Sequence, residues 1–210
     1  MQAENIVQQR ASIYLWFSQL LFQELTEEQL AGLASPQHHA WIASLASVPG
    51  LSSHVKRFER CLKQVLQRDC RQQELAADFA SLFLLAPPQG ISPYAGHYPH
   101  TTPPQERSQM NVLLVEYGLA PRDNESSDHV AVQLALMARM LEKQASVAAQ
   151  NYFLHHHLLC WVPLFLDGCL QRDALGFYAE AVSIIVGFMH EDEQYLQSLL
   201  MEDFCRSSQS

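Results

Sequence analysis

The sequence predicts an all-α fold, a helical bundle of about ten helices. The chain has 210 residues, 48% of them apolar, which is enough for a core that supports itself. It contains only 8 glycines, and long stretches lack any turn residue, which favours helices over short strands. The first long segment, residues 3–25, carries apolar side chains at helical spacing. No segment has a pattern that predicts a strand.

Capping residues and prolines divide the first part of the chain into separate helices. Thr26 and Gln29 have the spacing of a capping box, which predicts a short helix toward Leu33. A serine followed by proline at 35–36 supplies a cap and a first-turn proline for the next helix. The helices expected before residue 118 are 3–25, 26–33, 37–47, 52–67, 71–85 and 105–117.

A proline-rich loop interrupts these helices at 86–104, APPQGISPYAGHYPHTTPP. Its six prolines exclude a regular helix, because each one removes a backbone donor and constrains the residue before it. Long irregular loops inside compact domains are commonly functional or mobile. Two interpretations of Tyr94 and Tyr98 are open. They fasten the loop onto the helices, or they form an aromatic rim beside a groove that accepts an apolar peptide.

A second polar break, GLAPRDNESS at 118–127, divides the chain into two expected halves, 1–117 and 128–210. We expect this break to act as a hinge between the two helical halves. The helices expected after it begin at Asp128 and continue at 149–169, 172–188 and 192–205.

Composition excludes several classes of protein. The net charge is −9, with 13 basic and 22 acidic side chains, and no basic cluster suits a nucleic-acid backbone. An acidic surface favours cationic partners, although solubility alone explains the same charge. Five scattered cysteines without a CxxC motif indicate reduced thiols in a cytoplasmic protein. The longest apolar run, 158–166, is too short to cross a bilayer, so we expect no membrane insertion.

Motifs for catalysis are missing from the sequence. It has no phosphate-binding loop, no dinucleotide fingerprint, no GxSxG elbow and no HExxH. The run His155, His156, His157 is a poor metal site, because successive helical residues fan out by about 100° and do not converge on one ion. His156 and Cys160 are spaced to supply two ligands, but a third is not evident nearby. We therefore expect no metal.

An aspartate and a histidine, Asp128 and His129, stand where a long apolar helix begins. One interpretation is local: Ser126 or Ser127 caps the helix, and Asp128 lies in the first turn, where the helix dipole favours an anion. It does not account for His129, whose protonated form would oppose the dipole. The other interpretation is that a neutral imidazole beside a carboxylate, presented at the surface, binds an incoming cation or amide.

Three segments, in this order, resemble the TorD/DmsD family of cytoplasmic chaperones for redox enzymes exported by the twin-arginine route. They are DFASLF at 78–83, SPYAGHY at 92–98 and SDHVAVQLALM at 127–137. The similarity in helix order extends along nearly the whole chain, and the first two segments are closer to the TorD branch. The chain differs from the family pattern at Ser126, where a proline is usual, and at Gln133, where a glutamate is usual.

The resemblance implies a chaperone rather than an enzyme. Its partners would be the apo form of a molybdenum-cofactor reductase, of the trimethylamine N-oxide reductase type, and that enzyme's twin-arginine leader peptide, which it would shield until the cofactor is inserted. The resemblance also implies monomers and domain-swapped homodimers, exchanged through 118–127, and weak GTP binding without any other cofactor. The alternative is a nucleotide- or metal-dependent hydrolase on an all-helical scaffold.

A twin-arginine leader needs acceptors for two guanidinium groups beside a hydrophobic groove. The residues expected to bind the peptide are Asp128, His129, Gln133 and Glu125 at the acidic end, and Leu82, Phe83, Pro93, Tyr94 and Tyr98 along the groove.

Overall fold

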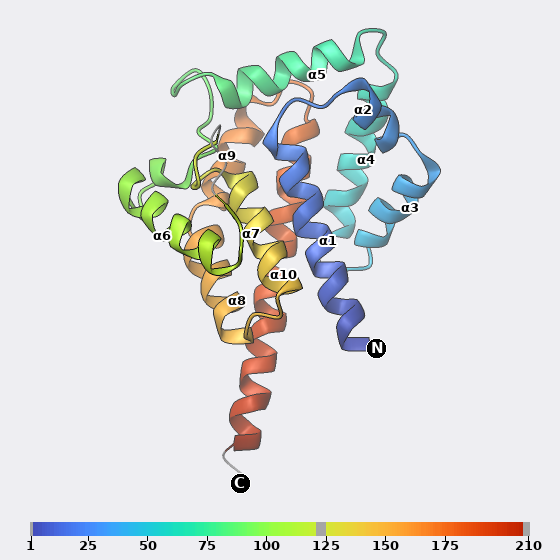
Figure 1. Cartoon of the computed structure of the whole chain (residues 1–210). Helices are drawn as coiled ribbons and strands as arrows, with labels where there is room; N and C mark the ends of the chain where they lie inside the picture. Colours follow the sequence, from blue (N-terminus) through green and yellow to red (C-terminus); the bar gives the residue numbers. More distant parts are fainter. Residues whose placement is uncertain (1, 121–124, 208–210) are drawn as a thin grey trace. The chain divides into compact units, whose positions relative to one another are not determined.

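The computed structural model describes residues 2–120 and 125–207 (Figure 1). Within these residues the regular structure is helical and contains no β-strand, which confirms the predicted all-α class. The α-helices are α1 (Gln2–Phe22), α2 (Glu27–Leu33), α3 (Pro36–Leu45), α4 (Ser52–Leu66), α5 (Arg71–Phe79), α6 (Pro103–Glu116), α7 (Val130–Glu142), α8 (Val147–Phe153), α9 (Val162–Arg172) and α10 (Phe177–Ser207). Short π-helices follow α5 and α8, at Ala80–Leu84 and Leu154–Leu159, and a 3₁₀ turn lies at Ala95–His97.

The predicted caps of α2 and α3 are confirmed. The Thr26 hydroxyl accepts a hydrogen bond from the backbone N–H of Gln29 at 3.2 Å, and the Gln29 side chain accepts one from the Thr26 N–H at 2.8 Å. The Ser35 hydroxyl accepts from the His38 N–H at 3.2 Å, and Pro36 is the first residue of α3. These local signals define both helix starts because the partners lie three residues apart in sequence.

Two expectations for the last third of the chain were wrong. The helices expected at 172–188 and 192–205 are one 31-residue helix, α10, since no proline interrupts the sequence between them. The helix expected at 149–169 is instead α8, a π-helix and α9. Pro163 lies in the first turn of α9 and has no N–H to continue the preceding helix, which accounts for the break before it.

Contacts within the chain define two units that interleave in sequence. Unit 1 comprises Met1–Gln19, Tyr94–Val162 and Met189–Ser210, and unit 2 comprises Leu20–Pro93 and Pro163–Phe188. This division differs from the sequential halves expected at 118–127, because segments on both sides of that break belong to unit 1. Residues 121–124 of the break lie outside the described residues, so its role as a hinge, and exchange through it in a dimer, stay predictions.

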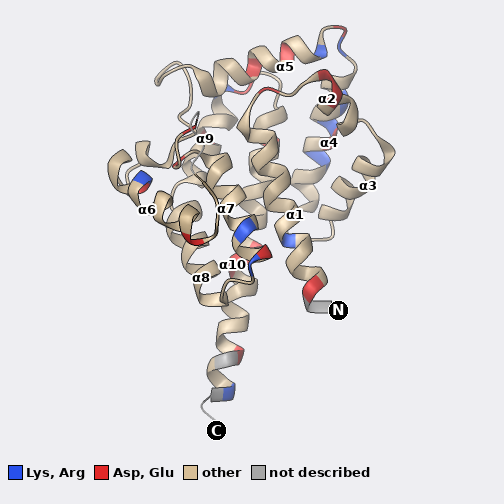
Figure 2. Cartoon of the chain, viewed as in Figure 1, with Lys and Arg blue, Asp and Glu red and all other residues tan. Residues whose placement is uncertain are grey.

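Each unit has its own set of buried side chains. In unit 1, α7 is buried on most of its surface, which explains why its sequence lacks a broad polar face. In unit 2, aromatic rings pack together: Phe58 lies 5.2 Å from Phe177, and Phe83 lies 5.6 Å from Tyr178, measured between ring centroids. The charged residues of α4 carry both signs (Figure 2), and Arg57 on this helix is paired with Glu180 at 2.9 Å.

One helical stretch, Val147–Arg172, is long and apolar enough to span a membrane by length and composition alone. Of its most apolar window, 44% is buried inside the protein, and core helices of soluble proteins meet the same criterion. The absence of membrane insertion therefore stays a prediction.

Candidate functional site

Asp128 lies directly before α7, and its side chain is completely buried, with an exposed fraction of 0%. Its Oδ1 atom accepts hydrogen bonds from Arg107 Nε at 3.1 Å and from the Ser126 hydroxyl. Its Oδ2 atom accepts one from the Gly96 N–H at 3.2 Å, and its carbonyl accepts one from the Ala95 N–H at 2.9 Å. Asp128 therefore connects the proline-rich loop, α6 and the start of α7 within unit 1.

His129, and not a serine, is the N-cap of α7. Its Nδ1 atom accepts a hydrogen bond from the Ala131 N–H at 3.1 Å, and the helix begins at Val130. Burial lowers the pKa of His129, although the carboxylates of Glu125 and Asp128 act in the opposite direction. The imidazole is thus a neutral acceptor at the positive end of the helix dipole. The expectation that a serine caps α7, with Asp128 in its first turn, was wrong.

The expected surface position of the pair was also wrong. Asp128 is 0% exposed and His129 is 4% exposed. Burial of polar groups is tolerated when they are hydrogen-bonded, and both side chains have partners inside the protein. In the free protein, neither side chain is therefore presented to a ligand from solvent.

Tyr94 and Tyr98 are half-buried and pack against neighbouring rings in unit 1. The ring of Tyr94 meets the His129 ring edge to face, with centroids 5.2 Å apart, and Tyr98 lies 4.9 Å from Trp161. Burial, together with the charge and hydrogen bond of Glu125, raises the pKa of Tyr94 to about 12. These contacts favour the interpretation in which the tyrosines fasten the loop.

Gln133 belongs to a buried polar network that the sequence did not reveal. The Glu106 Oε1 atom accepts from Gln133 Nε2 at 2.9 Å and lies 3.0 Å from His157 Nδ1, while Gln133 Oε1 accepts from Trp161 Nε1 at 3.0 Å. Glu106 is 1% exposed and Gln133 is 0% exposed. An amide at position 133 can donate to Glu106 and accept from Trp161, whereas a glutamate would place a second carboxylate against the first.

The histidine run lies in the π-helix Leu154–Leu159 and not in an α-helix as expected, and the rings of His155 and His156 lie 4.9 Å apart. His155 Nδ1 lies 2.8 Å from Glu193 Oε1, the ring of His156 lies 4.4 Å from that of Tyr152, and His157 contacts Glu106. Among the residues that the structure describes, His, Cys, Asp and Glu form no group of three or more that could hold a metal ion.

Three of the expected groove residues, Leu82, Phe83 and Pro93, belong to unit 2 and are buried. Phe83 packs against Phe79 and Tyr178, with ring centroids 5.1 and 5.6 Å apart. The exposed apolar side chains of this segment are the next two residues, Leu84 at 64% and Leu85 at 51%, which sequence reasoning missed. The structure therefore brings together in unit 1 only Tyr94, Tyr98, Glu125, Asp128, His129 and Gln133.

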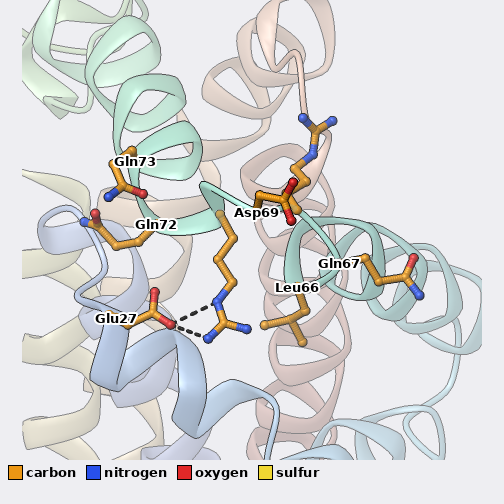
Figure 3. Close-up of a pocket in the computed structure, with 8 residues that line it drawn as sticks. Glu27, Leu66, Gln67, Asp69, Gln72 and Gln73 are labelled. Atoms are coloured by element: carbon orange, nitrogen blue, oxygen red, sulfur yellow. Dashed lines mark hydrogen bonds and ion pairs between the residues drawn. The ribbon is translucent and has the colours of Figure 1, made fainter.

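Two pockets in the described residues have linings that contain none of the expected site residues. One, in unit 2, has a volume of about 600 Å³ and a polar lining, and Figure 3 shows Glu27 on one side of it, paired with Arg71. The other, in unit 1, has a volume of about 380 Å³ and is lined by residues of α8, the second π-helix and α10. The residues expected to bind the peptide lie outside both of these pockets.

Asp78, the first residue of the DFASLF segment, shares a hydrogen bond in unit 2 with Asp173, which accepts from backbone N–H groups at the start of α10. Burial and the nearby Asp173 raise the pKa of Asp78 from 3.8 to about 7. A raised folded-state pKa stabilises the protein fully at low pH, and that stabilisation is lost as the pH rises from about 4 through about 7.

We expect Asp78→Asn to remove this pH dependence, because a neutral amide still donates to Asp173. Relative to the wild type, the variant should gain roughly 2 kcal/mol of stability between pH 5 and pH 8. Urea unfolding at the two pH values measures the difference. Asp69→Asn, at an exposed turn before α5, is the matched control and should follow the wild type. An unchanged pH dependence in Asp78→Asn would contradict proton sharing.

Comparisons with known proteins agree with the sequence resemblance. The family model described as the nitrate reductase delta subunit matches residues 48–167. A protein named Chaperone protein TorD from Salmonella bongori is 66% identical over 208 residues, covering 99% of this chain and 100% of that protein. TorD chaperones from Photobacterium profundum and Vibrio cholerae are 36% and 35% identical, covering 90% and 93% of this chain and 94% and 95% of their own lengths. With more than half of its length matched by the family model and nearly all of it aligned to these relatives, the chain belongs to the nitrate reductase delta subunit family, among its TorD chaperones.

Proposed function

We propose that this chaperone binds the apo form of an exported molybdenum-cofactor reductase, of the trimethylamine N-oxide reductase type, in the cytoplasm. It holds the enzyme and its twin-arginine leader until the cofactor is inserted. The observation that carries this proposal is the 66% identity to a TorD chaperone over 99% of the chain. Binding, without any bond-breaking step, is the activity that this assignment requires.

The site in unit 1 supports the leader as one ligand. The Asp128 carboxylate accepts a hydrogen bond from an arginine side chain of the same chain at 3.1 Å, which is the interaction that a leader arginine would seek. Guanidinium–carboxylate pairs are strong and directional, more so than pairs formed by lysine. Glu125, half-buried beside Tyr94, is the carboxylate that an arriving guanidinium meets first. Asp128 and His129 also hold the loop and the start of α7 in place.

Leader recognition is tested by changing the peptide and leaving the protein intact. In calorimetric titrations, a synthetic leader with two arginines should bind more tightly than one with two glutamines by about 1–3 kcal/mol. A peptide with two lysines has the same charge and should rank between them, because an ammonium cannot form the planar two-point contact. Equal affinity for all three peptides would contradict guanidinium recognition.

Client recognition is tested with purified trimethylamine N-oxide reductase. We expect the chaperone to comigrate with the apo enzyme in size-exclusion chromatography and to separate from the enzyme loaded with cofactor. Equal binding to both forms would contradict a role before cofactor insertion. Assays of GTP turnover and metal content on the same protein test the hydrolase alternative.

A further inference from the structure

Arg107 of α6 is hydrogen-bonded to the carboxylate of Asp128, which the proposed function assigns to an arginine of the leader. Its Nε–H donates to Asp128 Oδ1 at 3.1 Å. The two side chains differ in environment: that of Asp128 is 0% exposed, whereas that of Arg107 is 47% exposed. The buried carboxylate is thus covered by an arginine that reaches solvent.

A second buried carboxylate in unit 1, that of Asp192, forms a buried arginine–carboxylate ion pair that serves for comparison. Arg10 binds Asp192 with two nitrogens, Nε to Oδ1 at 2.5 Å and Nη2 to Oδ2 at 3.0 Å, and the side chains are 8% and 2% exposed. Tyr14 also donates to Asp192, at 2.8 Å. Arg107, in contrast, donates to Asp128 through one nitrogen and remains half-exposed, which is a weaker and more exchangeable arrangement.

From this contrast we infer that Arg107 is a resident substitute for a leader arginine, which displaces it from Asp128 when the leader binds. This inference rests on the proposed function. The backbone of Arg107 stays in α6, where its carbonyl accepts a hydrogen bond from Ser127 at 3.3 Å, and only its side chain moves into solvent. Ser126 and the Gly96 N–H keep their bonds to the carboxylate throughout the exchange.

The exchange explains how a completely buried carboxylate can serve a ligand. An unpaired buried charge is costly, so Asp128 requires a cation when the leader is absent. Replacing one guanidinium with another leaves the carboxylate paired in both states. Because Arg107 occupies Asp128 in the free protein, the apparent affinity for the leader equals the intrinsic affinity multiplied by the fraction of molecules in which Arg107 has left Asp128. The exchange also makes binding selective for arginine, because a peptide without a guanidinium group cannot replace that of Arg107 on Asp128.

The test is calorimetric titration of Arg107→Gln with the three synthetic leaders, those bearing two arginines, two lysines or two glutamines. Removing the resident guanidinium should tighten binding of the two-arginine leader about tenfold, as expected for a site that is open in about one molecule in ten. Affinity for the two-glutamine leader should not change. Arg139→Gln removes the same charge from an exposed pair with Glu142 on α7 and should behave like the wild type with each peptide.

Unchanged or weaker binding of the two-arginine leader by a folded Arg107→Gln variant would overturn the inference, and so would an equal gain for all three peptides. If the wild type binds no leader at all, the proposed function itself fails, so the two failures are distinguishable. If the wild type binds the three leaders with equal affinity, the proposed recognition of the leader through its arginines also fails.

A measurement on the unmodified side chain covers the case in which Arg107→Gln does not fold. The ¹⁵Nε resonance of Arg107, identified as the one missing in Arg107→Lys, should show slow proton exchange with solvent in the free protein. Saturation with the two-arginine leader should make that exchange fast, as in a solvated arginine, whereas the two-glutamine leader should not. Exchange that stays slow in the complex would show that Arg107 remains on Asp128 and would overturn the inference.

Discussion

Asp128→Ala is expected to lower the free energy of unfolding by about 2–4 kcal/mol. The substitution removes the acceptor of the buried Gly96 N–H, and it releases Arg107 and Ser126 from the carboxylate. A buried donor without a partner keeps its full desolvation cost. Arg107 is 47% exposed and can be hydrated instead, which keeps the loss below that of a completely buried pair. Urea unfolding followed by far-ultraviolet circular dichroism measures the change.

The matched control is Glu142→Ala, which breaks an exposed ion pair with Arg139 at 3.0 Å. Its effect should stay within about 0.5 kcal/mol, because exposed pairs contribute little. Similar losses in the two variants would show that Asp128 does not connect the loop to the helices. The result also bears on binding studies, since lost affinity in Asp128→Ala has to be separated from lost structure before it is assigned to a contact.

The second large effect is expected from Gly96→Ala, at the point where the proline-rich loop meets α6. A Cβ atom on residue 96 would lie 2.5 Å from Pro103 Cα and 2.8 Å from Asp128 Oδ2. The first neighbour is backbone and cannot move aside as a flexible side chain would. We expect a loss of about 3 kcal/mol or more, in the range of severe overpacking, measured as the shift in the urea midpoint.

Gly32→Ala is the control for a glycine without close neighbours. Residue 32 lies in α2, and an added Cβ would meet nothing within 4 Å. Alanine should therefore raise stability by about 0.5–1 kcal/mol through its higher helix propensity. A small effect at residue 96, comparable in size to that at residue 32, would contradict the tight contact between loop and helix.

The helices were predictable from the sequence where their signals are local. Thr26 finds its capping partner three residues later, and Ser35 with Pro36 specifies the start of α3 in the same way. The joining of the segments 172–188 and 192–205 into α10 was missed, although no proline lies between them. For these helices, capping residues predicted where a helix begins more reliably than the sequence pattern predicted how far a helix continues.

The site was only partly predictable, because its partners are distant in sequence. Asp128 is buried by Arg107, 21 residues away, and by Gly96, 32 residues away, and no periodicity reports such pairings. Glu106 was missed for a similar reason: a glutamate in the first turn of a helix is ordinary on the exposed side. Its position four residues before the buried Met110 was the available signal for an inward-facing side chain.

The indole of Trp161 makes the buried network visible to spectroscopy. The ring is 0% exposed, and its N–H lies 3.0 Å from Gln133 Oε1 and 2.8 Å from the His157 carbonyl, with Tyr98 of the proline-rich loop 4.9 Å away. Indole emission depends on local polarity and on water contact. A loosening of the loop would therefore shift the fluorescence of Trp161 to longer wavelength and expose it to quenchers. The chain in this way carries its own optical reporter for the state of its candidate site.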